Sequence, residues 1–181
     1  MQGIILIIGT LFLSLVSRRS IMQPGTHGYY RFFAWEFMLL LYVLNLPTWY
    51  DDIKAIHQIV ATLFFMVSFF MILTGALQLR MFGKPDSKRD DVPMLHFEKT
   101  TNLVTTGIYQ YIRHPIYGSL FFLCWGFFFK NPSLLGAVIA SLASVFLMLT
   151  ICVEEKENVK FFGNQYVDYM NRTKRLIPFI W

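Results

Sequence analysis

The feature that most constrains the fold is a stretch of 25 residues, Ala55 to Leu79, that contains no Lys, Arg, Asp or Glu. At about 1.5 Å per residue, a helix of this length exceeds the roughly 30 Å hydrocarbon core of a bilayer. Of the 181 residues, 55% are hydrophobic and 15% are charged, and a water-soluble chain of this size cannot bury so many apolar side chains. The sequence therefore predicts an all-α integral membrane protein.

Cutting the chain at its charges gives four further apolar segments: residues 1–17, 29–46, 115–129 and 131–153. Arg18 and Arg19 follow the first segment and no small-residue cleavage site is present, which predicts an uncleaved membrane anchor and not a signal peptide. Asn131-Pro132 separates the last two segments as a tight helical hairpin. We expect five transmembrane helices; a four-span alternative, with segment one or two lying in the interface, stays open.

The distribution of basic residues predicts the orientation of this bundle. With the N-terminus outside, only Lys54 and Lys130 lie on the outer side. The cytosolic side then holds fourteen Lys and Arg residues: Arg18, Arg19, Arg31, Arg80, Lys84, Lys88, Arg89, Lys99, Arg113, Lys156, Lys160, Arg172, Lys174 and Arg175. Because cytoplasmic loops concentrate Lys and Arg, we expect an odd number of spans and a cytosolic C-terminus.

The last part of the chain differs from the spans, because residues 154–171 alternate apolar and charged positions at helical spacing. This pattern predicts an amphipathic helix on the inner membrane surface, interrupted at Gly163. The two cysteines, Cys124 and Cys152, lie inside apolar runs and read as buried hydrophobes. No zinc, GxGxxG, P-loop or HExxH pattern is present, and the basic residues do not form a nucleic-acid-binding face.

Polar residues gather where the fourth predicted span begins and the fifth ends. Arg113 and His114 precede Pro115, which suits the first position of a helix whose free N–H groups face the cytosol. Glu154 and Glu155 close the fifth span, where acidic side chains oppose the helix dipole, so helix stability alone gives no reason for them. Because the two spans form a hairpin, we expect His114, Tyr117 and Glu154 to be neighbours.

Glu36 is a further candidate, because it lies about two turns inside the second span, where an ionisable residue is costly. It is predicted to line a substrate pocket or, as the alternative, to reach water at the interface. The tyrosines Tyr109 and Tyr117 could favour a cationic ligand through cation–π contact, or could pack at the interface.

The C-terminal half resembles the isoprenylcysteine carboxyl methyltransferases and their phospholipid methyltransferase relatives. The motifs that carry the resemblance are Asn102-Leu103-Val104, Gly107-Ile108-Tyr109, Arg113-His114-Pro115-x-Tyr117, Glu154-Glu155, Phe162-Gly163-x-x-Tyr166-x-x-Tyr169 and Arg175-Leu176-Ile177-Pro178. They keep their order and spacing from about Thr101 to Pro178. Residues 1–100 supply three compatible spans but no assigned motif, so we expect one membrane domain over residues 1–181 with its cofactor-binding region in residues 101–181.

The resemblance implies a membrane enzyme that uses S-adenosylmethionine in a cytosol-facing pocket and methylates a hydrophobic or lipidic acceptor. The cofactor contacts that it implies are Thr101, Asn102, Leu103, Val104, Tyr109, His114, Pro115, Ile116, Tyr117 and Glu154. His114 and Glu155 are the candidate catalytic residues, His114 as a base and Glu155 in a supporting role. Membrane lipids and the acceptor are the expected partners, and the sequence leaves the oligomeric state open.

One position departs from this family, because Thr150 stands where its carboxyl methyltransferases have an Arg that engages the substrate. A hydroxyl cannot pair bidentately with a carboxylate, so the resemblance leaves the acceptor open. Two alternative functions also stay open. One is an NADPH-dependent reductase of the sterol-reductase type, with Lys84, Lys88 and Arg89 as the basic residues available for the extra phosphate. The other is a non-catalytic bundle.

Overall fold

The computed structural model describes residues 1–84, 86, 89, 94–95 and 99–176. The α-helices are α1 (Gln2–Val16), α2 (Arg18–Ile21), α3 (His27–Asn45), α4 (Ile56–Phe82), α5 (Pro115–Lys130), α6 (Leu134–Phe162) and α7 (Asn164–Arg172). Two short 3-10 helices, η1 (Leu46–Thr48) and η3 (Gly107–Gln110), lie in the connections. These described residues form no β-strand, and Ile112 and Lys174 make an isolated bridge, so the predicted all-α class is confirmed.

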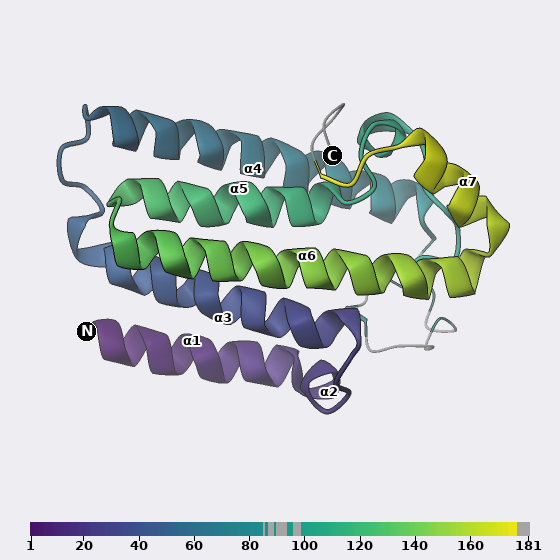
Figure 1. Cartoon of the computed structure of the whole chain (residues 1–181), viewed down its shortest axis with the longest axis horizontal. Coiled ribbons are helices and arrows are strands. Elements are labelled where there is room, and N and C mark those ends of the chain that lie inside the picture. Colours follow the sequence, from purple (N-terminus) through teal and green to yellow (C-terminus); the bar gives the residue numbers. More distant parts are fainter. Residues whose placement is uncertain (85, 87–88, 90–93, 96–98, 177–181) are drawn as a thin grey trace.

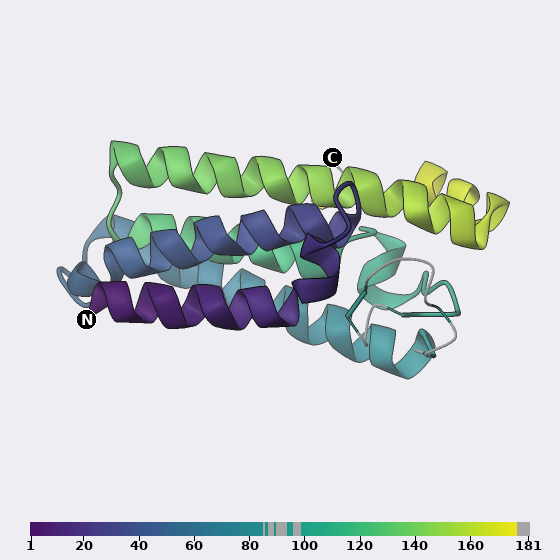
Figure 2. The ribbon, with the colours of Figure 1, turned by 90° about the horizontal axis from the view of Figure 1, so that it is seen from below.

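The long helices lie side by side along the long axis of the molecule (Figures 1 and 2). α4 packs mainly on α5, α3 packs mainly on α6, and α1 packs on α3. The chain reverses direction at each connection. One end of the bundle, which we name the α7 end, therefore collects α2, the segment that joins α4 to α5, and α7 (Figure 1). The opposite end, named the hairpin end, holds the connection after α3 and the turn between α5 and α6 (Figure 1).

The helix boundaries follow from local sequence chemistry. Pro115 occupies the first turn of α5, where its missing N–H costs no hydrogen bond. α6 begins three residues after Asn131, because Ser133 acts as its N-cap and accepts a hydrogen bond from the Gly136 backbone N–H at 3.0 Å. At the far end of α6, Gly163 adopts a φ of 61°, which suits glycine and ends the helix.

The predicted division between the fifth span and a separate amphipathic helix at Glu154 is wrong. α6 continues without a break from Leu134 to Phe162, and the amphipathic segment is shortened to α7 after Gly163. At 29 residues α6 is about 43 Å long, so its last turns extend beyond a bilayer core of roughly 30 Å. The change in polarity at Glu154 therefore marks where the apolar part of the helix ends, and not where the helix itself ends.

Small residues let the helices approach closely in the core. Ala34, Ala140 and Ala143 are completely buried, as is Cys124 between α5 and α6. Such residues are typical of helix contacts in membrane proteins. Both cysteines are unbridged, and Cys152 is half-buried.

Two helices, α4 and α6, are long and apolar enough to cross a membrane by length and composition, and α1 and α5 are shorter apolar helices. Only 22% of the most apolar window of α4 and 39% of that of α6 is buried within the protein, whereas a core helix of a water-soluble protein is mostly buried. Large apolar side chains are exposed along the bundle, including Ile4, Leu11, Phe12, Leu63, Met66, Phe69, Phe70, Leu135, Val138 and Val145. This surface suits contact with lipid.

Candidate functional site

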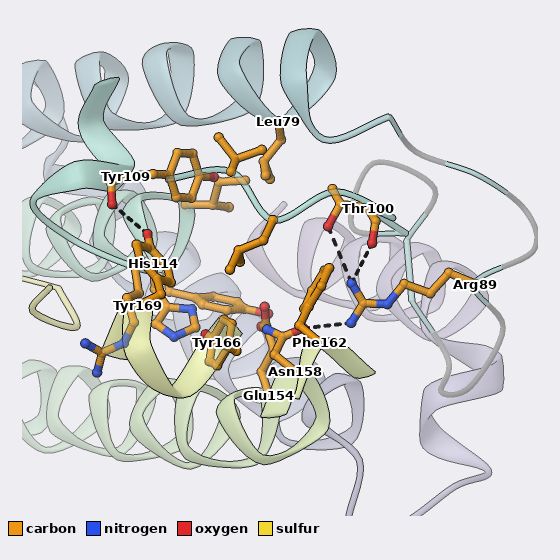
Figure 3. Close-up of a pocket in the computed structure, with 15 residues that line it drawn as sticks. Leu79, Arg89, Thr100, Tyr109, His114, Glu154, Asn158, Phe162, Tyr166 and Tyr169 are labelled. Atoms are coloured by element: carbon orange, nitrogen blue, oxygen red, sulfur yellow. Dashed lines mark hydrogen bonds between the residues drawn. The ribbon is translucent and has the colours of Figure 1, made fainter. Parts of the chain in front are cut away.

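A pocket opens at the α7 end of the bundle, where α4, α5, α6, α7 and the segment before α5 meet (Figure 3). Its lining comprises Leu79, Arg89, Thr100, Leu103, Val104, Tyr109, Arg113, His114, Ile116, Tyr117, Glu154, Asn158, Phe162, Tyr166 and Tyr169. The cavity has a volume of about 80 Å³ and lies within a wider recess of about 620 Å³ that is partly open to solvent. An adenosine-sized ligand would therefore have to move the lining side chains apart.

Glu155 lies beneath the pocket and ties three segments of the chain together. Its Oε1 accepts from Arg113 Nε at 2.8 Å and lies 2.7 Å from Arg113 Nη2, while its Oε2 accepts from Arg175 Nε at 3.1 Å. His114 Nε2 lies 3.5 Å from Oε1. Because both carboxylate oxygens are bound by guanidinium groups, Glu155 is an anchor for the segments that carry Arg113 and Arg175.

The balance of charge around Glu155 keeps it ionised. Glu155 lies beyond the predicted span, which ends at Val153. Burial raises its pKa, but the nearby His114 imidazole and the hydrogen bonds from Arg175 and Arg113 outweigh burial and lower the pKa from 4.5 to about 2. The same contact raises the pKa of Arg175. At neutral pH this site therefore holds a buried carboxylate between two guanidinium cations.

The chain after α7 pairs with the segment that leads into α5. Arg113 N donates to Lys174 O at 2.8 Å, and His114 N donates to Arg175 O at 3.0 Å. The Tyr169 hydroxyl on α7 donates to Tyr109 O at 2.6 Å. These bonds hold α7 against the pocket and set the direction in which His114 enters it.

Glu154, one residue before Glu155, has a different environment. It lines the pocket, and its Oε2 is buried without a hydrogen-bond partner among the described residues. A buried carboxylate oxygen without a partner is costly. Glu154 therefore has the character of a binding residue that a ligand with hydrogen-bond donors would satisfy.

Aromatic rings form much of the remaining wall. The His114 and Tyr117 rings have centroids 5.7 Å apart, and the Phe162 and Tyr166 rings stack at 6.3 Å. Burial raises the pKa of Tyr109, Tyr166 and Tyr169, and the charge of Glu154 raises those of Tyr109 and Tyr166 further. These phenols are neutral near pH 7, so their rings and hydroxyls can contact a ligand without adding negative charge.

The structure brings seven of the ten predicted cofactor contacts to this one pocket: Leu103, Val104, Tyr109, His114, Ile116, Tyr117 and Glu154. Thr101, Asn102 and Pro115 do not line it. The Thr101 hydroxyl donates to Lys84 O at 2.9 Å, the Asn102 N–H donates to Gly83 O at 3.1 Å, and Pro115 packs near Gly75.

The two predicted substrate residues lie away from the pocket lining. Thr150 is completely buried, and its hydroxyl donates to Phe146 O of the preceding turn at 2.8 Å. Glu36 faces α1, where its Oε2 accepts from the Thr10 hydroxyl at 2.8 Å, and its Oε1 is buried without a hydrogen-bond partner in the described part of the chain.

Several pocket residues were not among the predicted contacts. Asn158 and Phe162 follow Glu154 at intervals of four, so helical spacing alone indicated that they share its face. Arg89 and Thr100 lie in an irregular segment with no periodicity to place them. Of the basic residues considered for NADPH, Arg89 reaches this pocket, Lys84 is exposed, and Lys88 lies outside the described residues.

Comparison with known proteins gives a family match over residues 56–165, to the model described as phospholipid methyltransferase. A methanethiol S-methyltransferase of Crocosphaera subtropica is 26% identical over 172 residues, which cover 90% of this chain and 64% of the relative. Protein-S-isoprenylcysteine O-methyltransferases are also similar. The Tribolium castaneum protein is 37% identical over 92 residues (48% of this chain, 32% of the relative), and the Mus musculus protein is 31% identical over 133 residues (72% and 45%).

The chain thus spans less than two thirds of the length of each of these relatives. No solved structure matches it significantly.

Proposed function

This chain belongs to the phospholipid methyltransferase family, and from that premise we propose that it transfers a methyl group from S-adenosylmethionine to a hydrophobic acceptor. The observation that carries the proposal is Glu154 Oε2, which is buried without a hydrogen-bond partner among the described residues, in an aromatic pocket at one end of an apolar helix bundle. The relatives, which are named as methyltransferases, support the same reaction class.

The residues around the pocket have the chemistry that this cofactor requires. S-adenosylmethionine supplies an activated methyl group on a sulfonium cation. Glu154 would accept hydrogen bonds from the ribose hydroxyls, and the faces of Tyr109 and Tyr117 would favour the positive charge, at about 0.5–2 kcal/mol for each ring. Binding would have to widen the narrow pocket, which Leu103 and Val104 also line. The segment between Thr100 and Tyr109 lies across the pocket from α6 (Figure 3).

His114 is the residue we propose as the base. It lines the same pocket as Glu154, and its backbone is held by the pairing with Arg175. A thiol or ammonium acceptor has to lose a proton before or during methylation, and a neutral imidazole can accept it. Glu155 would support this role by anchoring Arg113 and by lying 3.5 Å from the His114 ring.

The electrostatics of the pocket favour an acceptor without a carboxylate. Arg113 and Arg89 line the pocket, but Arg113 binds Glu155, and Arg89 binds Asn158 and Thr100. Thr150, where the related carboxyl methyltransferases have an Arg, bonds to its own helix. Since one relative is a methanethiol S-methyltransferase, an apolar thiol is the acceptor class that we favour over a prenylcysteine carboxylate.

We further propose that residues 1–181 form one membrane domain in which α1, α3, α4, α5 and α6 each cross the bilayer. The N-terminus would lie outside and the α7 end in the cytosol. The soluble cofactor would then enter from the cytosol, and an apolar acceptor would enter from the lipid.

The test is binding of S-adenosylmethionine to the purified chain in detergent, measured by calorimetry. We expect saturable binding that Glu154→Gln weakens about 10- to 100-fold, because hydrogen bonds to a charged group contribute roughly 1.5–3 kcal/mol. Asp168→Asn, which changes an exposed acid on α7, is the matched control and should bind like the wild type. Glu157 is a poorer control, because it accepts a hydrogen bond from the His27 backbone N–H at 3.1 Å, so its substitution would disturb the contact between α6 and α3.

Two outcomes would contradict the proposal. The first is saturable binding of NADPH without binding of S-adenosylmethionine, which would favour the reductase. The second is an equal loss of affinity in Glu154→Gln and Asp168→Asn, which would remove Glu154 from the site.

A further inference from the structure

Two polar side chains on the last turns of α6 form one edge of the pocket. Glu154 and Asn158 are four residues apart on one helix and both line the pocket. Side chains at this spacing lie about 5–6 Å apart on the same face. The edge therefore offers two adjacent hydrogen-bonding positions to one ligand.

Arg89 reaches Asn158 from the segment between α4 and α5 (Figure 3). Its Nη2 donates to Asn158 Oδ1 at 2.7 Å, and its Nη1 donates to the Thr100 carbonyl at 2.8 Å. The guanidinium carbon also lies 4.2 Å from the centre of the Phe161 ring. With a side chain only 2% exposed, Arg89 is held on several sides.

This contact decides which way the Asn158 amide faces. A guanidinium group carries only hydrogen-bond donors, so the Asn158 atom that Arg89 contacts must be the oxygen. The amide N–H groups then point away from Arg89. The Asn158 amide has two N–H groups, and one of them donates to the Tyr166 hydroxyl, where it lowers the pKa of that phenol. The second N–H can act as a donor to a ligand in the pocket, next to the acceptor that Glu154 provides.

We propose that Arg89 is a positioning residue that holds Asn158 as a hydrogen-bond donor to a purine ring nitrogen of the cofactor, beside a carboxylate that binds the ribose. The inference rests on the proposed function. Adenosine matches both positions of this edge, because its ribose hydroxyls donate to Glu154 and its ring nitrogens accept from Asn158. Arg89 also lines the pocket, but the effect proposed here passes through the Asn158 amide that it orients.

The experiment measures binding of S-adenosylhomocysteine and its 1-deaza, 3-deaza and 7-deaza analogues by calorimetry. In the wild type, we expect one analogue to bind about tenfold more weakly than the parent, because it lacks the nitrogen that Asn158 contacts. Asn158→Leu should bind the parent about tenfold more weakly and should not discriminate between it and that analogue. In Arg89→Met, the discrimination should fall below about threefold although Asn158 is still present. Full discrimination in Arg89→Met, or none in the wild type, would overturn the inference.

Matched variants separate positioning from simple destabilisation. Arg89→Lys keeps a donor for Asn158 Oδ1 and should retain most of the discrimination, and Arg172→Met, an exposed change on α7, should retain all of it.

If Arg89→Met does not fold, Asn158→Asp decides the question. It keeps a partner for Arg89 but removes the donor, so it should keep the wild-type melting temperature and lose discrimination, and retained discrimination would refute the inference. Absence of any saturable binding to the wild type would instead refute the proposed function.

Discussion

Glu154 and Glu155 are adjacent in the sequence, yet the helix sends them into different surroundings. Neighbouring side chains on a helix point about 100° apart, so one faces the pocket while the other faces the segments before α5 and after α7. Glu155 is compensated by Arg113 and Arg175, whereas Glu154 keeps a buried oxygen without a partner among the described residues. One residue therefore stabilises the site and the other is available to a ligand.

The contribution of Glu155 should depend on pH. The pKa of Glu155 is lowered from 4.5 to about 2 in the folded chain. Glu155 therefore stabilises the fold fully above about pH 4.5, and this contribution is lost as the pH falls from about 4.5 to about 2. Glu155→Gln should lower the free energy of unfolding by about 3 kcal/mol at pH 7, since it leaves two buried cations uncompensated. Melting in detergent across this pH range should show the difference from the wild type shrinking towards pH 2. A difference independent of pH would contradict the assignment.

The convergence of His114, Tyr117 and Glu154 was predictable because it depends only on a hairpin. The start of one helix and the end of the next must be neighbours when a short turn joins their other ends. Arg89 could not be placed in this way, because its contact with Asn158 is made across 69 positions from an irregular segment. Local patterns carry no information about such a contact.

At the scale of the elements, hydropathy located the apolar helices well but misplaced the end of α6. The predicted spans 55–79 and 115–129 correspond to α4 (Ile56–Phe82) and α5 (Pro115–Lys130). α6 instead continues for nine residues beyond Val153, because polar residues such as Lys156 and Glu157 form helix as readily as apolar ones. Hydropathy indicates whether a helix faces lipid or water, whereas the helix ends where the backbone leaves the helical conformation, here at Gly163.

The turn at Gly163 should be sensitive to substitution. Its φ of 61° is unfavourable for an L side chain, although nothing lies within 4 Å of the position where a Cβ would be. Gly163→Ala should therefore cost about 1–3 kcal/mol through backbone strain alone. Because α7 carries Tyr166 and Tyr169 into the pocket, affinity for S-adenosylmethionine should also fall.

Gly3 provides the matched control, since it too has open space around it but lies within α1 without a positive φ. Gly3→Ala should leave the melting temperature and cofactor affinity unchanged or slightly raise the former. Equal melting temperatures for the two variants would show that Gly163 carries no strain.

At the scale of the whole molecule, apolar surface and charge are arranged along one axis. Exposed apolar side chains cover the length of α1, α4 and α6, and the pocket lies at the α7 end. Lys54 and Lys130 lie at the hairpin end, whereas the α7 end holds Arg18, Arg19, Lys84, Arg89, Lys99, Lys174 and Arg175. The antiparallel arrangement of the long helices is therefore compatible with five spans and with a pocket on the more basic side.

This orientation predicts which loops a reagent can reach from outside the cell. Tyr50, 78% exposed at the hairpin end, and Gln165, exposed on α7 at the other end, are suitable positions for single cysteines. In intact cells, a membrane-impermeant maleimide should label Tyr50→Cys strongly and Gln165→Cys only after the membrane is permeabilised. The unmodified chain gives the background, because Cys124 is buried and Cys152 is half-buried beside apolar residues of α5 and α6. The reverse pattern would place the pocket outside the cytosol, away from the soluble cofactor. Labelling of both positions in intact cells would contradict an odd number of spans between them.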